Sequence, residues 1–286
     1  MSGIPLPPAV AACLAELQAW AALPERASLS PRARAFLAEP STLRRYAVAR
    51  NGDAAAAIKA LEATVAWREA ALAPPLGCRD CDANIESHCF FPLGFSDATD
   101  ADPGGRLIVY ACAARALTNE ADSAVNHMLA TLEHAWASRM GDVVPPTRLC
   151  WIVDFRGFGF SHAMQGKTSN AFLSQFGAHL PERLERAVLL SPPGIFDVLL
   201  ALIRPFVDAR TLGKVLIIRP TAATVKAELA ALGITAPGQV AWLSAVLEMD
   251  AKPGNLPPLS LLGDVSSFAL PHLIKAAAAD AAKAAK

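Results

Sequence analysis

The segment from residue 179 to residue 218 constrains the fold more than any other part of the chain. Two short apolar runs, 187–190 and 215–218, flank a PPG turn at 192–194 and the sequence IFDVLLALI at 195–203. Strands that alternate with a helical pattern predict a βαβ unit, and therefore a parallel sheet. The helix between them is apolar on nearly every face, so both faces need an apolar cover. It is too short to cross a bilayer, which takes about 20 residues.

The composition excludes several classes of protein. Of the 286 residues, 53% are hydrophobic and 18% are charged, which favours a large core over disorder. Lys plus Arg and Asp plus Glu both number 26, so the chain lacks the net positive charge typical of nucleic-acid-binding proteins. We find neither a secretory signal in MSGIPLPPAV nor an apolar run of transmembrane length. Because six cysteines are few for this length, we expect a reduced, cytoplasmic protein.

Helical patterns fill the first quarter of the chain. Ser30 and Pro31 are a capping residue and a first-turn proline, and Asp53 caps a longer apolar pattern. Beyond a loop-rich stretch at 76–105, strands are expected at 107–113 and 149–155, and helices at 118–138, 171–180 and 224–232. We therefore expect an α/β protein with a helical domain at 1–75, a domain with a mixed, largely parallel sheet at 76–267, and an Ala/Lys-rich tail at 268–286.

Four residues of the loop-rich stretch are candidate zinc ligands: Cys78, Cys81, His88 and Cys89. Four nitrogen or sulfur ligands within so short a segment are compatible with zinc. However, the spacing after the Cys-x-x-Cys pair is shorter than in common structural sites, and no second pair exists. We therefore favour ordinary loop thiols and expect no metal.

No enzyme signature emerges from the remaining motifs. The sequence SHAMQGKT at 161–168 is similar to a phosphate-binding loop, but Ser161 replaces the glycine that lets backbone amides turn toward phosphate. An ATP-dependent enzyme through Lys167 stays a remote alternative. Ser161 and His162 lack the G-x-S-x-G context of a hydrolase. Asp154, at a strand end, is best interpreted as a carboxylate that anchors the following loop.

Glu182 and Lys214 each lie at the start of one of the two strands of the opening segment. Glu182 follows Leu180-Pro181 and precedes the first strand, and Lys214 begins the second. On their own they would be solvated charges at the ends of a sheet, which is usual for surface Glu and Lys.

Four segments together resemble the CRAL-TRIO (Sec14-like) family of lipid-binding proteins. They are STLRRYAVARNGDAAAAIKALEATVAWR from Ser41, WIVDFRGF from Trp151, HLPERLERAVLLSPPGIFDVLLALIRPFVDARTLGKV from His179, and NLPPLSLLG from Asn255. The resemblance implies a helical N-terminal domain and an α/β domain that encloses a lipid cavity. It further implies a phospholipid or other hydrophobic ligand, no other cofactor, transient peripheral contact with a membrane, no nucleic acid and a monomer.

In this family the apolar helix after the PPG-like turn is a gate over the cavity. The resemblance therefore explains how that helix can be apolar all round, since one face would pack on protein and the other on acyl chains. The gate and cavity residues that it implies are Ile195, Phe196, Leu199, Leu200, Leu202, Ile203, Phe206, Trp151 and Leu149.

The resemblance also implies a headgroup site for phosphatidylinositol. Glu182 and Lys214 match the glutamate and lysine that contact the inositol headgroup, and Thr211 and Arg50 match a threonine and an arginine nearby. A carboxylate that accepts inositol hydroxyls, with cations around the phosphate, is reasonable chemistry.

The chain departs from the family pattern in two places. Asn51 replaces a lysine that follows the arginine, which removes one positive charge near the phosphate. Leu149 and Trp151 replace Ser and Thr residues that resemble phosphatidylcholine contacts, which disfavours that lipid. We expect a phosphatidylinositol-transfer protein; the alternatives are a carrier of a tocopherol-, retinal- or sterol-like hydrophobe, and a lipid-sensing membrane adaptor.

Overall fold

The computed structural model describes residues 5–71, 78–99, 104–118, 120–142, 145–159, 162, 166–194, 196, 212–221 and 223–284. The chain divides into two compact units. The first contains residues 1–76 and 172–183, and the second contains residues 77–171 and 184–286. In the described part of the chain, no helix combines the length and apolarity needed to span a membrane.

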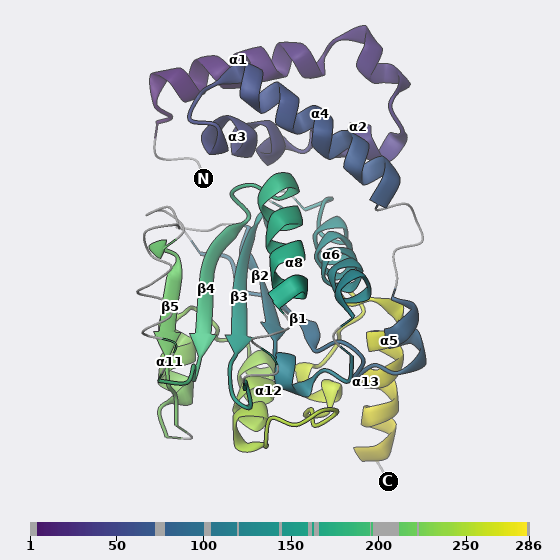
Figure 1. Ribbon diagram of the computed structural model, residues 1–286, viewed down its shortest axis with the longest axis vertical. Helices are drawn as coiled ribbons and strands as arrows, with labels where there is room; N and C mark the ends of the chain where they lie inside the picture. The colour runs from purple at the N-terminus through teal and green to yellow at the C-terminus, as the bar shows by residue number, and fades with distance from the viewer. Residues whose placement is uncertain are drawn as a thin grey trace. The chain divides into compact units, whose positions relative to one another are not determined.

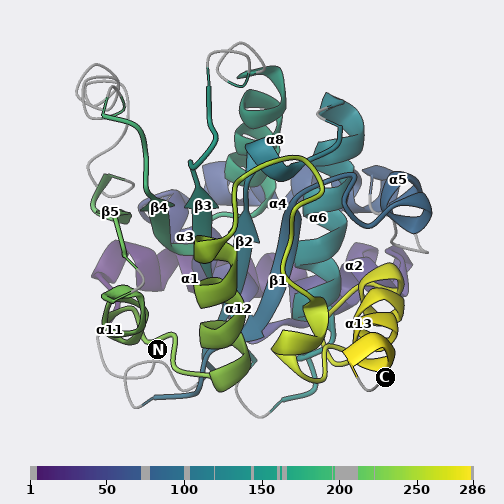
Figure 2. The same ribbon diagram turned by 90° about the horizontal axis from the view of Figure 1, so that it is seen from below.

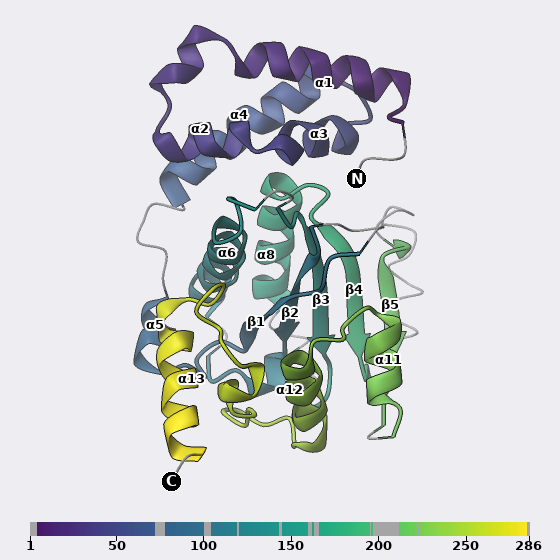
Figure 3. The same ribbon diagram turned by 180° about the vertical axis from the view of Figure 1, so that it is seen from behind.

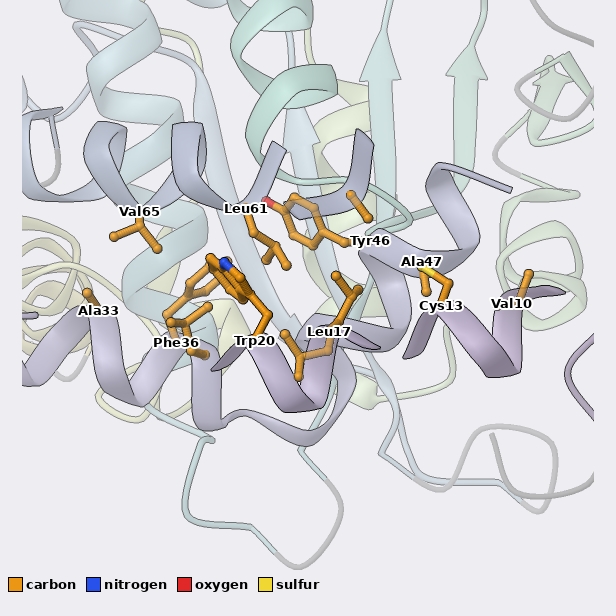
Figure 4. Packing of buried hydrophobic residues seen from close by; sticks show 13 residues of the cluster. Val10, Cys13, Leu17, Trp20, Ala33, Phe36, Tyr46, Ala47, Leu61 and Val65 are labelled. Carbon is orange, nitrogen blue, oxygen red and sulfur yellow. The ribbon is translucent and has the colours of Figure 1, made fainter. Parts of the chain in front are cut away.

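The first unit is a bundle of short helices. They are α1 (Pro8–Ala21), the 3-10 helix η1 (Pro24–Ser28), α2 (Pro31–Ala38), α3 (Pro40–Ala49) and α4 (Ala54–Ala71). Ser30 Oγ accepts the backbone N–H of Ala33, and Asp53 Oδ1 accepts that of Ala56, so both expected caps form. Leu17, Trp20, Phe36 and Tyr46 belong to the buried core that these helices share (Figure 4).

Part of helix α8 (Gly166–His179) also belongs to the first unit, which includes it from Phe172 onward. The ring of His179 stacks on Trp67 with centroids 4.3 Å apart, and its Nδ1 lies 3.1 Å from Thr64 Oγ1. Tyr46 Oη donates to Thr64 Oγ1 at 2.7 Å and lies 3.1 Å from the His179 carbonyl oxygen. Burial and then the charge of Arg68 lower the pKa of His179, so the ring is neutral at neutral pH.

A five-stranded sheet forms the centre of the second unit, in the order β1-β2-β3-β4-β5 (Figure 1). The strands are β1 (Phe90–Phe95), β2 (Arg106–Ala111), β3 (Arg148–Asp154), β4 (Leu184–Leu190) and β5 (Val215–Ile218). β1 pairs antiparallel with β2, and the other neighbours are parallel. The expected α/β class with a mixed, largely parallel sheet is therefore confirmed.

Helices lie on both faces of this sheet. Helix α6 (Ala121–Ala137) lies on one face, while α11 (Val225–Ala231) and α12 (Pro237–Glu248) lie on the other (Figure 2). On the α12 face, the ring of Trp242 packs against Tyr110 at 5.0 Å between centroids. The remaining elements are α5 (Arg79–Ala83), the 3-10 helices η2 (Ala113–Arg115) and η4 (Leu259–Leu262), and α13 (Pro271–Ala284).

Two regions differ from the sequence-based expectation. The stretch at 76–105 was expected as loops, but it contains α5 and the edge strand β1. Pro92 and Gly94 lie inside β1, where the register with β2 shifts, and such residues are tolerated at a sheet edge. The region 268–286, expected as a tail, contains α13, in which His272, Leu273 and Ala277 are buried.

Candidate functional site

The sheet face opposite α11 and α12 carries an apolar surface over β3, β4 and β5. Pairing between these strands aligns its side chains in two rows. The first row is Trp151, Ala187 and Val215, and the second is Val153, Leu189 and Ile217. Trp151, Val153, Val215 and Ile217 remain half-buried. Because half-buried apolar side chains in aligned rows can cover an apolar ligand, this surface is the candidate ligand-facing wall.

Sequence reasoning named only Leu149 and Trp151 for this wall. Leu149 is fully buried, and Trp151 is the member of the first row that lies on β3. The rest of the two rows was missed, although successive residues of a strand point to opposite faces, so that Val153 shares the face of Trp151.

One residue of the expected gate lies within the described chain. Phe196 follows the PPG turn, and its ring lies 4.9 Å from that of Phe155, between centroids. Phe155 directly follows β3, and its backbone N–H bonds to the Leu190 carbonyl at the end of β4. The ring contact with Phe155 thus places the start of the expected gate beyond the carboxyl ends of β3 and β4. The other expected gate residues lie outside the described residues: Ile195, Leu199, Leu200, Leu202, Ile203 and Phe206.

Glu182 occupies an unusual backbone position. It follows Pro181 in a turn closed by a hydrogen bond from Arg183 N–H to the Leu180 carbonyl, at 3.3 Å. Its φ is 57°, and such a turn favours glycine or asparagine at this place. Strained residues that the surrounding structure holds in place are often functional, so the conformation supports a role for this half-buried carboxylate.

Buried charges fix both sides of this turn. Arg45 Nη1 donates to the Pro181 carbonyl at 3.3 Å, and its Nη2 pairs with Glu39 Oε2 at 3.3 Å. Burial opposes the ionisation of Glu39. The charges of Arg183 and Arg45 and hydrogen bonds from Ser41 and Thr42 outweigh it, so the pKa of Glu39 falls to about 2. The Glu182 turn is therefore held by an ionised carboxylate and two arginines.

The other expected headgroup residues lie at several places in the chain. Lys214 is half-buried directly before β5, and its carbonyl accepts the Ala187 N–H at 2.9 Å. Arg50 ends α3 as its C-cap residue. Thr211 lies outside the described residues. Glu182 and Arg50 belong to the first unit and Lys214 to the second, so the convergence of these side chains stays a prediction.

Asp154 anchors the loop after β3. Its Oδ1 accepts the backbone N–H and the Nε of Arg156, both at 3.0 Å, while its Oδ2 accepts Tyr110 Oη at 2.6 Å. Arg156 in turn donates to the Leu247 and Val246 carbonyls at the end of α12. This confirms the interpretation of Asp154 as a loop anchor, since its oxygens are already occupied.

The opposite sheet face has a small apolar hollow of about 280 Å³, part of it open to solvent. Ile152 and Leu190 of the sheet and Leu229 and Leu243 of the covering helices contribute to its lining. Its enclosed part is only about 10 Å³, far below the usual range for ligand pockets, about 300–1,000 Å³. The segment with the similarity to a phosphate-binding loop lies largely outside the described residues.

These observations define an α/β protein with helices on both faces of its sheet and an apolar wall over β3, β4 and β5 on the face opposite α11 and α12. Residues 98–230 match the family model of the CRAL/TRIO domain. This match supports a CRAL-TRIO domain in the sheet-containing part of the chain, and proteins with this domain generally bind or carry lipids.

The crystal structure of Sfh5 is similar at 15% identity and a TM-score of 0.45, over 65% of this chain and 65% of Sfh5. This chain thus spans less than two thirds of the length of Sfh5. No curated protein matches the sequence.

Proposed function

We propose that this protein binds one lipid, favours phosphatidylinositol and exchanges it between membranes as a carrier rather than an enzyme. The observation that carries the proposal is the pair of apolar rows on β3, β4 and β5, with Trp151, Val153, Val215 and Ile217 half-buried. The match of residues 98–230 to the CRAL/TRIO domain model supports a lipid as the apolar ligand.

Acyl chains would lie against the rows, and the segment around 195–207 would cover them. Each buried methylene contributes about 0.8 kcal/mol, so a two-chain lipid is held strongly and its release into water is prohibitive. Exchange therefore requires a membrane surface, on which the covering segment opens. Peripheral, transient membrane contact follows from this mechanism.

The headgroup preference rests on Glu182 and Lys214. A carboxylate accepts hydrogen bonds from inositol hydroxyls, and Lys214, Arg50 and Thr211 would neutralise and bind the phosphate. The positive φ of Glu182 supports this role, because a residue selected only for the turn would be glycine or asparagine.

The test is native mass spectrometry of the purified protein, lipid extraction, and transfer assays between vesicles with and without phosphatidylinositol. Glu182→Ala and Lys214→Ala should reduce inositol-lipid loading. Glu62→Ala and Lys252→Ala are matched controls, since their side chains are 51% and 70% exposed. Unchanged phosphatidylinositol loading in both site variants would overturn the headgroup assignment.

A carrier of a tocopherol-, retinal- or sterol-like hydrophobe is the second candidate. It is favoured by the apolar indole of Trp151 in the first row, at a position where the family pattern has a polar residue that resembles a phosphatidylcholine contact. Transfer of such a hydrophobe, without any transfer of inositol lipid, would establish this candidate in place of the first.

A further inference from the structure

The second unit buries a cluster of cysteine and histidine side chains that the lipid site does not use. Its members are Cys78, Cys81, His88, His127 and His272, each at most 6% exposed. The ligand atoms of Cys78, Cys81 and His88 lie within 4.8 Å of one another, as do those of Cys81, His127 and His272. Cys81 is common to both sets. The cluster joins α5 and its following loop to α6 and α13, and α5 lies beside α13 in Figures 1 and 3.

The hydrogen bonds of His127 fix its tautomer. Its Nε2 lies 2.9 Å from the Phe90 carbonyl oxygen, which can only accept, so Nε2 carries the proton. The lone pair of Nδ1 therefore points to Cys81 Sγ, 3.5 Å away. A backbone carbonyl that orients the second nitrogen of an imidazole is typical of histidine metal ligands.

A hydrogen bond also fixes the tautomer of His88. Ser123 Oγ donates to Asp80 Oδ2, which leaves Ser123 Oγ as the acceptor for His88 Nε2 at 2.9 Å. Nε2 of His88 is then protonated, and its Nδ1 is the bare nitrogen. That Nδ1 is buried and has no hydrogen-bond partner among the described residues. A buried nitrogen without a partner is destabilising, and a bound cation would offset this.

We propose that Cys78, Cys81, His88 and His127 bind one zinc ion in a tetrahedral structural site. The two thiolates and two neutral imidazoles form a donor set that suits zinc, and their charges neutralise the ion. Tetrahedral bonds of about 2.3 Å to sulfur and about 2.0 Å to nitrogen place S and N atoms about 3.5 Å apart. The 3.5 Å between Cys81 Sγ and His127 Nδ1 has this value.

Cys89 is not a ligand in this site, although it is adjacent to His88 in sequence. Its backbone carbonyl accepts the Cys112 N–H, and its thiol belongs to neither set of close ligand atoms. His272 lies next to the site, with its Nδ1 3.6 Å from Asp82 Oδ1. Neither of its ring nitrogens has a hydrogen-bond partner in the described chain, so nothing orients this ring as Ser123 orients His88, and we place it outside the four ligands.

The site cross-links α5 and the loop that follows it to a helix that is distant in sequence. A zinc ion would connect α5 and the loop at 84–89 to α6, and Cys78 would be held at the start of α5. Metal binding then contributes directly to the stability of the second unit, because the site does not exist in the unfolded chain.

The test is the zinc content of the full-length protein, purified without chelators or metal-affinity resin and measured by inductively coupled plasma mass spectrometry. We expect one zinc per chain. Substitution of a ligand by Cys81→Ser or His127→Gln should lower zinc affinity at least about tenfold in competition with a chromophoric chelator. Cys89→Ser and Cys13→Ser are the cysteine controls and should retain full zinc.

A second measurement uses the wild-type protein, so it tests the proposal even if the ligand variants do not fold. Cobalt added to the metal-free wild-type protein should produce thiolate charge-transfer absorption, and zinc should displace it and raise the thermal unfolding temperature. A folded wild-type protein that takes up neither metal would overturn the proposal. Full zinc in His88→Ala together with its loss in His272→Ala would overturn the assignment of His88. These readouts do not depend on lipid, so the two proposals can fail separately.

Discussion

Glu182 adopts a backbone conformation that costs a non-glycine residue about 1–2 kcal/mol. We predict that Glu182→Gly leaves the free energy of unfolding unchanged or raises it by up to about 1 kcal/mol, since glycine relieves this strain but gains entropy when unfolded. Urea unfolding measures this difference. Inositol-lipid loading should nevertheless fall, as in Glu182→Ala. A marked loss of stability in Glu182→Gly would instead mean that the carboxylate serves the fold.

The lowered pKa of Glu39 predicts that the first unit loses stability in acid. Its pKa is held at about 2 in the fold and rises toward its ordinary value of about 4.5 on unfolding. The stabilisation is therefore complete above about pH 4.5 and is lost as the pH falls toward about 2. Glu39→Gln should flatten this pH dependence, as measured by urea unfolding at about pH 5 and about pH 3.

A matched control for Glu39 is Glu62, an exposed carboxylate paired with Arg26 at 3.2 Å. Glu62→Gln should change stability by less than about 1 kcal/mol at either pH, because exposed ion pairs contribute little. Equal effects of the two substitutions would contradict the prediction for Glu39.

At the scale of elements, the loop after β3 depends on Gly157. Its φ is 71°, and an added Cβ would lie 2.5 Å from the Ala251 carbonyl oxygen and 2.9 Å from Ala114 Cβ. We predict that Gly157→Ala lowers the free energy of unfolding by more than about 1 kcal/mol, since backbone atoms cannot move aside cheaply. Thermal unfolding checks this.

Gly177 in α8 is the control for Gly157. Nothing lies within 4 Å of a Cβ added there, so Gly177→Ala should raise stability by up to about 1 kcal/mol through helix propensity. Destabilisation by both substitutions would mean that the Gly157 clash is not the cause.

The elements differ in how well the sequence predicts them. β3 and β5 are continuous apolar runs between turns, and α2 has a serine cap and a first-turn proline, so local rules suffice. β1 was missed because Pro92 and Gly94 are typical of loops, and only its pairing with β2 makes it a strand. His127 was missed as a possible ligand because it lies 46 residues from Cys81, and only the fold brings them together.

For the whole molecule, the first unit requires residues from two distant parts of the chain. We predict that residues 1–76 alone are less stable than a fusion of 1–76 to 172–183 through a Gly/Ser linker. The fragment lacks His179, which contacts Tyr46, Thr64 and Trp67 in the complete unit. Thermal unfolding compares the two, with a scrambled 172–183 segment as control. Equal stability would show that the later segment contributes nothing to the bundle.

The fold class followed from sequence because alternating strands and helices leave few arrangements of a parallel sheet. The grouping of 172–183 with the N-terminal helices did not follow, because no local pattern records which helix a histidine will stack on. The same limit applies to the lipid site: apolar rows follow from strand alternation, whereas the positive φ of Glu182 depends on the charges that hold its turn.

The divided first unit also has a consequence for synthesis on the ribosome. Its last residues, at 183, emerge 107 residues after residue 76 (183 − 76), which takes about 5–20 s at about 5–20 residues per second. During this interval the N-terminal helices exist without His179, so the Trp67 ring and the Tyr46 hydroxyl lack their native contacts with that residue. The N-terminal bundle is therefore incomplete until β1, β2 and β3 have been made.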